Sequence, residues 1–303
     1  MNSIKVNDKE FEIIKLLGKG KGGYSYLVTD GIEKYVVKKI HHEPCSYYTF
    51  GNKLESEITD YMRLKKIGVE MPKMYDVDKE NEHILKEYID GDTIFDMVKA
   101  DMDVSEYVKQ AEKMCEKLYA ANTNIDYFPT NFIPSDNKLY YVDYECNDYM
   151  EEWNFENWGI LYWSKTKEFV NYVNKEIVKK FFEEGYEKHN YECIMNILSE
   201  NYIDHSHAGA RSNKDAVGIL KKVENMFSNM KIEVLDIFAE MNMVAARVKY
   251  SGVHTGNCMG IEGTGKFITF EAMENFKIDN GKIIESWGYW PDLEIQSFLK
   301  GDN

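Results

Sequence analysis

The chain has 303 residues, of which 44% are hydrophobic and 29% are charged, and this is the composition of an ordinary folded soluble protein. Its 37 basic and 52 acidic residues give a formal net charge of −15, which repels phosphate backbones and anionic lipid surfaces. We therefore expect neither nucleic acid nor a membrane as a partner. The five cysteines form no Cys-x-x-Cys pair, and the first residues do not form a signal peptide. Both features predict reduced thiols and a cytoplasmic location.

The first half is predicted to begin with an antiparallel meander and to continue with helices. Short apolar, β-rich segments predict strands over 11–17, 24–29 and 34–40. The pair Asp30-Gly31 is typical of a tight turn between two of them. Apolar residues at helical spacing then predict helices over 53–66 and 104–121.

Glycines lie between the first two predicted strands of this meander. Gly18, Gly20 and Gly23 satisfy the pattern G-x-G-x-x-G, but a dinucleotide-binding fingerprint would have to open a helix. A glycine loop between strands is either a plain turn or a cover over a triphosphate. The second alternative is chemically sound because glycine lets backbone N–H groups approach phosphate oxygens.

Residues suited to phosphate chemistry follow the loop in a fixed order. In chain order they are Lys38 on the next strand, Glu57 on the first helix, Glu87 and Tyr88 on an apolar strand over 83–89, then Asp126, Asn131 and Asp143. Taken one at a time, the acids are typical of solvated turns. The order and spacing of the whole set are what favour a function.

This set resembles the protein-kinase-like phosphotransferases, and most closely their small-molecule branch, the aminoglycoside and choline kinase group. The resemblance covers roughly residues 10–163 and implies ATP and Mg²⁺ as cofactors. It implies that Lys38 holds the α- and β-phosphates and pairs with Glu57, and that Asp126 accepts the proton of the attacking hydroxyl. It also implies nucleotide contacts from Gly18, Gly20, Gly23, Glu87 and Tyr88, and magnesium ligands from Asn131 and Asp143.

The first half also departs from that family. Asn124 stands where a histidine is common, Asp143 is followed by Tyr144-Glu145 rather than Phe-Gly, and no activation segment follows. Most small-molecule relatives also carry a larger helical lobe after the metal-binding aspartate. These departures argue against a regulated protein kinase and leave the source of an acceptor site open.

The second half is predicted to be an α+β cone, in which a curved antiparallel sheet wraps around helices and leaves a cavity. Helical spacing covers 172–188 and 213–228, and period-two alternation predicts strands over 231–240, 243–252, 266–278 and 282–290. The residues Asp279-Asn280-Gly281 predict the hairpin turn between the last two strands.

The stretches 201–205, 252–256, 263–266 and 279–287 resemble the SnoaL-like polyketide cyclases of the nuclear transport factor two-like superfamily, over about 172–300. That superfamily contains enzymes as well as catalytically silent binding domains. In the cyclases an aspartate near the end of the last strand does acid/base work without a cofactor, and Asp292 is the nearest match, offset by Pro291. The resemblance therefore implies no cofactor for this half.

Alternation along the third predicted strand of the second half singles out Glu274. The residues that share its face are apolar: Ile268, Phe270, Ala272, Phe276 and Ile278. A carboxylate in such a row should face the cavity with a raised pKa, which makes it a candidate acid or base. The alternative is a structural glutamate paired with Arg247 or with a backbone donor.

Other polar residues of this half have two interpretations each. His254 is either a proton-transfer group or a structural histidine, and Trp287 either stacks on a ligand or belongs to the core. Asp204, His205 and His207 are metal ligands by type, but their place before a helix favours capping and surface roles.

Together these patterns predict an α+β protein of two separately folding domains, a compact protein-kinase-like fold over 1–168 and a cone over 169–303. The leading interpretation is an ATP-dependent phosphotransferase acting on a small hydroxylated molecule, fused to a ligand-binding or cyclase domain, in bacterial secondary metabolism or resistance. The competing interpretation is a non-catalytic nucleotide-sensing kinase remnant joined to a small-molecule-binding cone. The expected partners are a small-molecule substrate or ligand and a second copy of the chain, bound through the cone.

Overall fold

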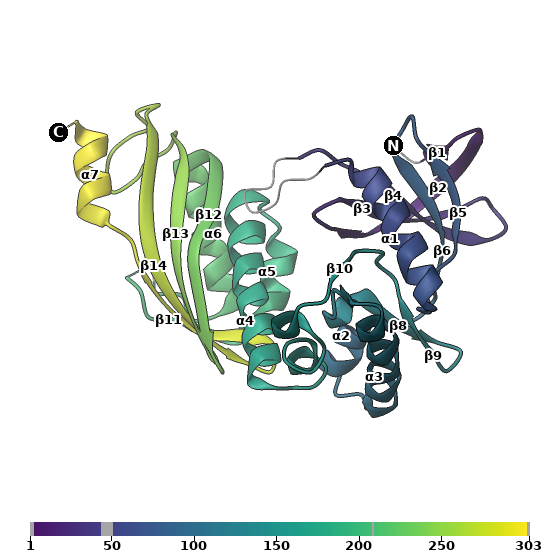
Figure 1. Cartoon of the computed structure of the whole chain (residues 1–303). Coiled ribbons are helices and arrows are strands. Elements are labelled where there is room, and N and C mark those ends of the chain that lie inside the picture. Colours follow the sequence, from purple (N-terminus) through teal and green to yellow (C-terminus); the bar gives the residue numbers. More distant parts are fainter. Residues whose placement is uncertain (1–2, 44–50, 208, 302–303) are drawn as a thin grey trace. The chain divides into compact units, whose positions relative to one another are not determined.

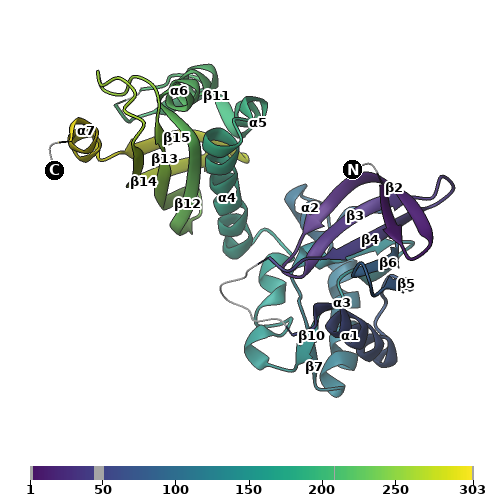
Figure 2. The same cartoon turned by 90° about the horizontal axis from the view of Figure 1, so that it is seen from above.

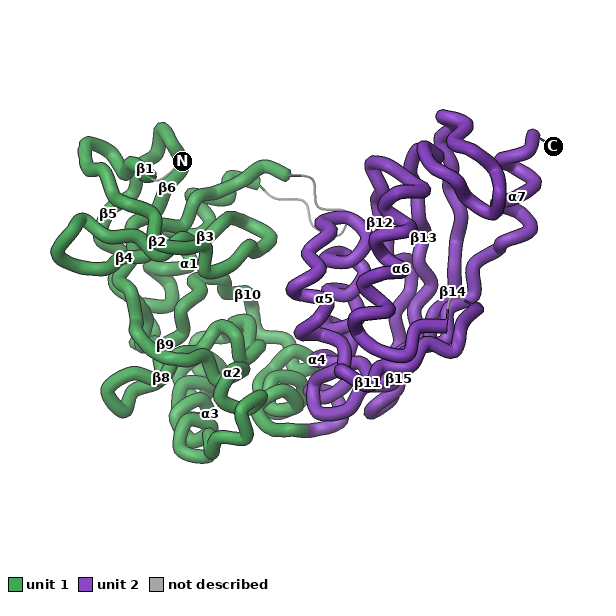
Figure 3. The backbone as a smooth tube through the Cα atoms, turned by 180° about the vertical axis from the view of Figure 1, so that it is seen from behind, with its two compact units in different colours: residues 1–165 green, residues 166–303 purple. Residues whose placement is uncertain are grey.

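The computed structural model describes residues 3–43, 51–207 and 209–301, and the fold is mixed α+β. The chain forms two compact units, residues 1–165 and 166–303 (Figure 3). The division lies close to the expected boundary at 168, while the separate folding of each half stays a prediction. No helix in the described part of the chain is long and apolar enough to cross a membrane. Cys45 lies outside the described residues.

The first unit contains a six-stranded sheet in which every neighbouring pair is antiparallel. Its strands, in spatial order, are β1 (Ser3–Val6), β2 (Lys9–Lys19), β3 (Gly23–Thr29), β4 (Lys34–Ile40), β6 (His83–Glu87) and β5 (Met74–Asp78). The predicted meander is therefore confirmed as β2-β3-β4. Gly31, with φ of 92°, supplies the left-handed backbone of the β3–β4 turn.

Helix α1 (Lys53–Ile67) covers part of one face of this sheet (Figure 2). It begins where the Asn52 side chain accepts a hydrogen bond from the Glu55 N–H, and it ends at Gly68 with φ of 86°. Leu54 packs against Ile40 of β4 and Ile84 of β6. This packing places α1 beside β4, where the predicted lysine lies.

The rest of the first unit consists of short elements around an aromatic cluster. They are α2 (Ile94–Lys99), α3 (Ser105–Ala120), the strand pairs β7 (Thr123–Ile125) with β10 (Cys146–Asp148) and β8 (Phe132–Ser135) with β9 (Lys138–Tyr141), and 3-10 turns over Pro129–Asn131, Glu151–Trp153 and Gly159–Tyr162. Trp163 is fully buried against Phe132 and Phe155, and its Nε1–H donates to the Tyr127 carbonyl at 2.9 Å. Aromatic packing thus closes this unit after β10.

The second unit wraps a curled, mainly antiparallel sheet against helices α4, α5 and α6 (Figure 1). The sheet order is β11 (Leu198–Asp204), β15 (Lys282–Tyr289), β14 (Phe267–Asp279), β13 (Met243–His254) and β12 (Phe227–Glu240). The helices are α4 (Lys167–Phe182), which continues as a π-turn over Glu183–Glu187, α5 (Tyr191–Ile197), α6 (Asn213–Met226) and α7 (Asp292–Lys300). The predicted curved antiparallel sheet and its four long strands are confirmed, and the sheet forms a curled half-barrel.

Two details of this sheet bear on the cavity. Asn280 and Gly281 have φ of 48° and 72°, so the predicted turn joins β14 to β15 with two left-handed residues. Strand β11 pairs with β15 in parallel, and neither this strand nor its pairing was predicted from the sequence. This pairing brings residues near 204 beside Ser286, some eighty residues later in the chain.

Candidate functional site

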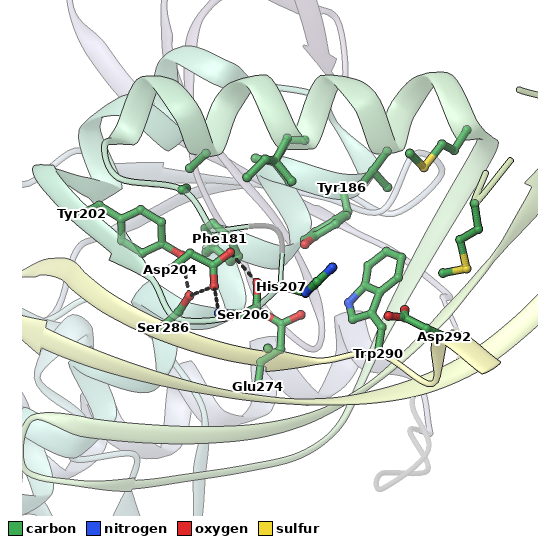
Figure 4. A pocket seen from close by; sticks show the side chains of 18 residues that line it. Phe181, Tyr186, Tyr202, Asp204, Ser206, His207, Glu274, Ser286, Trp290 and Asp292 are labelled. Atoms are coloured by element: carbon green, nitrogen blue, oxygen red, sulfur yellow. Dashed lines mark hydrogen bonds between the residues drawn. The ribbon is translucent and has the colours of Figure 1, made fainter. Parts of the chain in front are cut away.

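The second unit contains a cavity of about 380 Å³ between its helices and its sheet (Figure 4). Phe181, Tyr186 and Trp290 contribute aromatic walls, and Asp204, Glu274 and Asp292 contribute carboxyl groups. A mostly apolar hollow of this size with a few polar groups is typical of a small-molecule site.

Glu274 reaches the cavity because of its register in β14. The pairing of β14 with β13 runs without a bulge from 267 to 277, so Glu274 keeps the face of its apolar neighbours. It lies opposite Gly288 of β15, where an added Cβ would stand 3.4 Å from Glu274 Cγ. Glu274 is only 6% exposed, and Tyr250 donates its hydroxyl hydrogen to Oε1 at 2.7 Å.

Burial raises the pKa of Glu274 from its ordinary value of 4.5 to about 7, because desolvation penalises the carboxylate. Hydrogen bonds from Tyr250 and Trp290 act in the opposite direction, and the nearby Asp204 adds to the rise. The alternative of a pair with Arg247 is wrong, since that guanidinium binds Asp236 and Glu271 instead. The Glu274 carboxyl group therefore titrates much closer to neutral pH than an ordinary glutamate does.

Asp204 enters the cavity from the end of β11 and is held by neutral donors. Its Oδ1 accepts the Ser206 N–H at 2.8 Å, and its Oδ2 accepts the Ser206 hydroxyl at 2.7 Å (Figure 4). Ser286 Oγ lies 3.5 Å from Oδ1 and also hydrogen-bonds the Tyr202 hydroxyl. From the sequence, Asp204 was expected to be only a metal ligand or a cap. Four residues that line the cavity or bind its acids were not predicted: Tyr202, Tyr250, Ser286 and Trp290.

The remaining candidates of this half separate in the structure. Asp292 lines the cavity from an exposed position at the start of α7, and His207 also lines it. Trp287 stacks on His205, with ring centroids 4.7 Å apart, and neither is among the described lining residues. The described residues contain no group of three or more His, Cys, Asp or Glu side chains that could hold a metal ion.

His254 is not brought to the cavity. It is completely buried beside Phe227, and its Nδ1 accepts the Thr264 N–H at 3.2 Å. Its Nε2 is buried without a hydrogen-bond partner in the described part of the chain. Because His254 does not reach the described cavity lining, the geometry favours the structural interpretation of this residue.

In the first unit, β4 and α1 bring Lys38 and Glu57 together. The Lys38 ammonium contacts Glu57 and lies 3.2 Å from Asp143 Oδ1. Burial acts to lower the pKa of Lys38, but the two carboxylates outweigh it and raise this pKa. Burial likewise acts to raise the pKa of Asp143, but Lys38 and Lys86 outweigh it and lower the value to about 2. Lys38 and Asp143 are therefore charged at neutral pH.

Asp126 and Asn131 meet at the 3-10 turn after β7. Asp126 Oδ1 accepts the Phe128 N–H at 3.0 Å, and the Asn131 amide donates to the Asp126 backbone carbonyl at 3.2 Å. Burial raises the pKa of the Asp126 carboxyl, and the negative charge of Asp143 adds to this rise.

The glycine loop connects β2 to β3 beside the cluster formed by Lys38, Glu57 and Asp143. Gly18 lies at the end of β2, Gly23 opens β3, and the Gly20 N–H donates to the Gly23 carbonyl at 2.9 Å. The buried Lys53, which the sequence analysis missed, donates to the Lys21 carbonyl at 3.3 Å and so ties the loop to α1.

Glu87 and Tyr88 lie at and just after the end of β6, where they bind nearby groups. Glu87 Oε2 accepts the Lys73 N–H at 3.0 Å, and Tyr88 donates to Asp90 Oδ1 at 3.0 Å. Sequence reasoning also missed Lys86 on the same strand, which is buried and donates to the Val142 carbonyl at 2.7 Å. A lysine within the apolar run over 83–89 was the available signal for it.

Comparison with known proteins shows which family the second unit resembles. Residues 176–297 match the family of SnoaL-like polyketide cyclases. Similar solved structures include TsrD from Streptomyces laurentii, IdmH from Streptomyces antibioticus and a SnoaL-like polyketide cyclase from Agrobacterium tumefaciens strain C58. Their identities are 17%, 19% and 13%, and their TM-scores are 0.40, 0.39 and 0.38. Each match covers 42% of this chain and 95%, 98% and 97% of those chains.

None of the curated proteins searched matches this chain significantly. The family match covers the end of α4, the helices α5 and α6, all five strands of the curled sheet and the cavity between them. The second unit thus contains a SnoaL-like polyketide cyclase-type domain over residues 176–297.

Proposed function

We propose that the cavity of the second unit binds a small organic molecule and that Glu274 transfers a proton to or from it. One observation carries this proposal: a 6% exposed carboxyl group lines an apolar cavity and has a pKa of about 7. A group with a pKa near the working pH is suited to both accepting and donating a proton. The match to polyketide cyclases supports this class of chemistry.

The reaction that fits is proton abstraction next to a carbonyl group. A Glu274 oxygen takes the proton from the carbon atom, and the C–H electron pair becomes that of an enolate. In a cyclisation the enolate carbon attacks a second carbonyl carbon of the same molecule, and the resulting alkoxide oxygen takes up a proton. The apolar walls from Phe181, Tyr186 and Trp290 would exclude water from these steps.

Hydrogen–deuterium exchange at an activated carbon tests this proposal without knowledge of the natural substrate. The probe is 2-tetralone, a bicyclic ketone, and the loss of its α-proton signals in D₂O is followed by NMR. We expect the protein to accelerate the exchange and Glu274→Gln to reduce the acceleration by about 10²-fold or more.

Glu271→Gln is the matched control, because Glu271 is on the same strand but points to the outer face, where it binds Arg247. The control should exchange like the wild type. Equal acceleration by wild type and Glu274→Gln would refute the proposed role of Glu274.

A second candidate function belongs to the first unit, for which we propose a protein-kinase-like fold and ATP-dependent transfer of a phosphoryl group to a small hydroxylated molecule. The observation that favours it is the contact of Lys38 with both Glu57 and Asp143, which come from β4, α1 and the segment between β9 and β10. A lysine fixed between two acids provides a positioned point charge for phosphate.

The residues present fit the two implied cofactors. Asn131 uses its amide nitrogen on the Asp126 carbonyl, which leaves the side-chain oxygen for a hard cation, and Asp143 offers a carboxylate ionised at neutral pH. Lys38 would hold phosphate oxygens, and Asp126 would accept the proton of the attacking hydroxyl. ATP, when bound with Mg²⁺, supplies the phosphoryl group.

Two substitutions separate binding from transfer in this unit. Lys38→Ala should weaken ATP binding, whereas Asp126→Ala should leave ATP affinity nearly intact and abolish transfer to a panel of aminoglycosides, sugars and amino alcohols. The exposed Lys39 and Glu116 provide controls, since Lys39→Ala and Glu116→Ala remove charges of the same sign without touching the cluster.

The outcomes of this experiment also decide between the two interpretations of the first unit. ATP binding without transfer to any acceptor would favour the nucleotide-sensing remnant. Equal loss of binding and transfer in both variants would contradict the separate roles of Lys38 and Asp126.

A further inference from the structure

The two faces of the sheet in the second unit carry different charged groups. On the outer face, each basic side chain of β13 and β14 forms an ion pair: Arg247 with Asp236 and Glu271, Lys249 with Glu233, and Lys277 with Glu285. Their N···O distances lie between 2.6 and 3.0 Å. The basic groups of these strands are therefore used outside the cavity.

The inner face carries acids without such partners. Asp204, Glu274 and Asp292 line the cavity, and none of them forms an ion pair within the described part of the chain. The lining residues that the structure describes include no Lys or Arg, and His207 contributes the one imidazole among them. The cavity is thus acidic and lacks a strong cation of its own.

The donors that do contact the two inner carboxyl groups are neutral. Glu274 is bound by the hydroxyl of Tyr250, and Asp204 by the backbone and hydroxyl of Ser206. Arg211 lies nearby, but its guanidinium donates to the backbone carbonyls of Asp204 and Ala210. Buried carboxylates are ordinarily paired with a cation, because desolvating a lone charge is costly. Here that cation is missing from the described residues around the cavity.

We propose that the ligand of this cavity carries a protonated amine, which is held against the Asp204 and Glu274 carboxylates beside the rings of Tyr186 and Trp290. Both rings line the cavity, and aromatic faces attract ammonium groups. The volume of about 380 Å³ admits a drug-sized molecule in which the amine is attached to an apolar body. This inference rests on the proposed function and names the substrate class of the same site.

An amine in this place would also support the proposed chemistry. A positive charge beside Glu274 favours the carboxylate, which is the form that accepts a proton from carbon. The positive charge of the ligand would then balance the negative charge of the Glu274 carboxylate. Asp292, at the exposed start of α7 next to Trp290, would attract the same charge during entry.

Three probes with one aromatic body and different charge test the inference. They are 1-naphthylmethylamine, its neutral N-acetyl derivative and the anion 1-naphthaleneacetate. Their binding to the full chain is measured by ligand-observed NMR at about pH 8 and physiological ionic strength, where salt screens the long-range attraction of a net charge of −15. We expect the amine to bind about tenfold more tightly than the N-acetyl derivative, and the anion to bind most weakly.

Variants assign the preference to the cavity. Asp204→Asn and Glu274→Gln should each weaken amine binding and leave binding of the N-acetyl derivative unchanged, whereas Glu271→Gln on the outer face should change neither. A preference that survives both inner substitutions, or that Glu271→Gln reduces equally, would overturn the inference.

The result with wild-type protein is decisive even where a variant does not fold. Binding of the N-acetyl derivative or the anion as tightly as the amine would overturn the inference and leave the proposed proton transfer intact. Absence of binding by all three probes would overturn the ligand cavity as well. Amine preference with deuterium exchange that Glu274→Gln does not slow would instead refute only the proton transfer.

Discussion

Each of the two units contains an acidic side chain that is largely shielded from solvent, and the two acids behave in opposite ways. Asp143 in the first unit has a pKa of about 2, whereas Glu274 in the second has a pKa of about 7. Desolvation acts to raise both values. The difference comes from the neighbours, because Asp143 faces the ammonium groups of Lys38 and Lys86 while Glu274 meets only the neutral donors Tyr250 and Trp290.

Two buried lysines of the first unit, Lys38 and Lys86, show the same contrast in their pKa values for a positive charge. Lys38 contacts two carboxylates, which raise its pKa in spite of burial. Lys86 is equally buried on the neighbouring strand, and desolvation together with the charge of Lys38 lowers its pKa to about 8. A buried charge that has its partner is fixed over the whole physiological pH range. One without a partner titrates within that range and is free for chemistry or for a ligand's charge.

The largest expected effect comes from breaking the paired cluster. Lys38→Met leaves the partly buried carboxylates of Glu57 and Asp143 without the ammonium that contacts both, and it should lower the free energy of unfolding by about 3–5 kcal/mol. Urea denaturation of the full chain measures this change. Lys39→Met, on the exposed side of the same strand, should change the stability by less than about 0.5 kcal/mol. A loss below about 1 kcal/mol in Lys38→Met would show that the cluster is not held by this lysine.

A smaller effect is expected from the unpaired acid, and it depends on pH. The folded state binds the proton of Glu274 more tightly than the unfolded state does, with a pKa of about 7 against an ordinary 4.5. Between these two values the unfolded state therefore releases its proton first, and the stability falls as the pH rises. The shift corresponds to roughly 3 kcal/mol, all of it lost above about pH 8.

Comparison with Glu274→Gln isolates this contribution, because glutamine does not titrate. From about pH 5 to pH 8, the wild type should lose roughly 2–3 kcal/mol of unfolding free energy relative to the variant. Urea denaturation of both proteins at several pH values provides the measurement. A constant difference across this range would mean that Glu274 keeps its ordinary pKa in the folded protein.

The position of Glu274 could be predicted from the sequence better than its surroundings could. The reason is that its face depends on neighbours along one strand, whereas its surroundings come from strands distant in the sequence. A strand has a period of two, so the apolar residues from 268 to 278 alone define the face on which Glu274 lies. Asp204 and Ser286 meet only through the parallel pairing of β11 with β15. No local pattern encodes that pairing, and so the network around Asp204 could not be predicted. Trp290 lies beyond the end of β15, where the alternation that pointed to Trp287 no longer applies.

In the first unit, the strands and α1 followed from local patterns, but the meeting of Lys38 with Glu57 was expected only from the family resemblance. Periodicity places each residue on its own element and does not say which elements pack together. Lys86 shows the same limit, since the apolar run over 83–89 makes this lysine conspicuous but does not say which groups would surround its ammonium. Its surroundings come from residues far along the chain, because its ammonium donates to the Val142 carbonyl and lies over the Tyr144 ring.

The smallest expected effect comes from a single methyl group placed beside the unpaired acid. Gly288 lies opposite Glu274, and a Cβ there would stand 3.4 Å from Glu274 Cγ and 3.7 Å from Oε2. Gly288→Ala should thus change the free energy of unfolding by less than about 1 kcal/mol, because these contacts are ordinary or only slightly tight. The methyl group displaces water from the carboxylate, so the pKa of Glu274 should rise further. The pH midpoint of 2-tetralone exchange should move upward in this variant, and an unchanged or lower midpoint would show that solvent reaches Glu274 by another route.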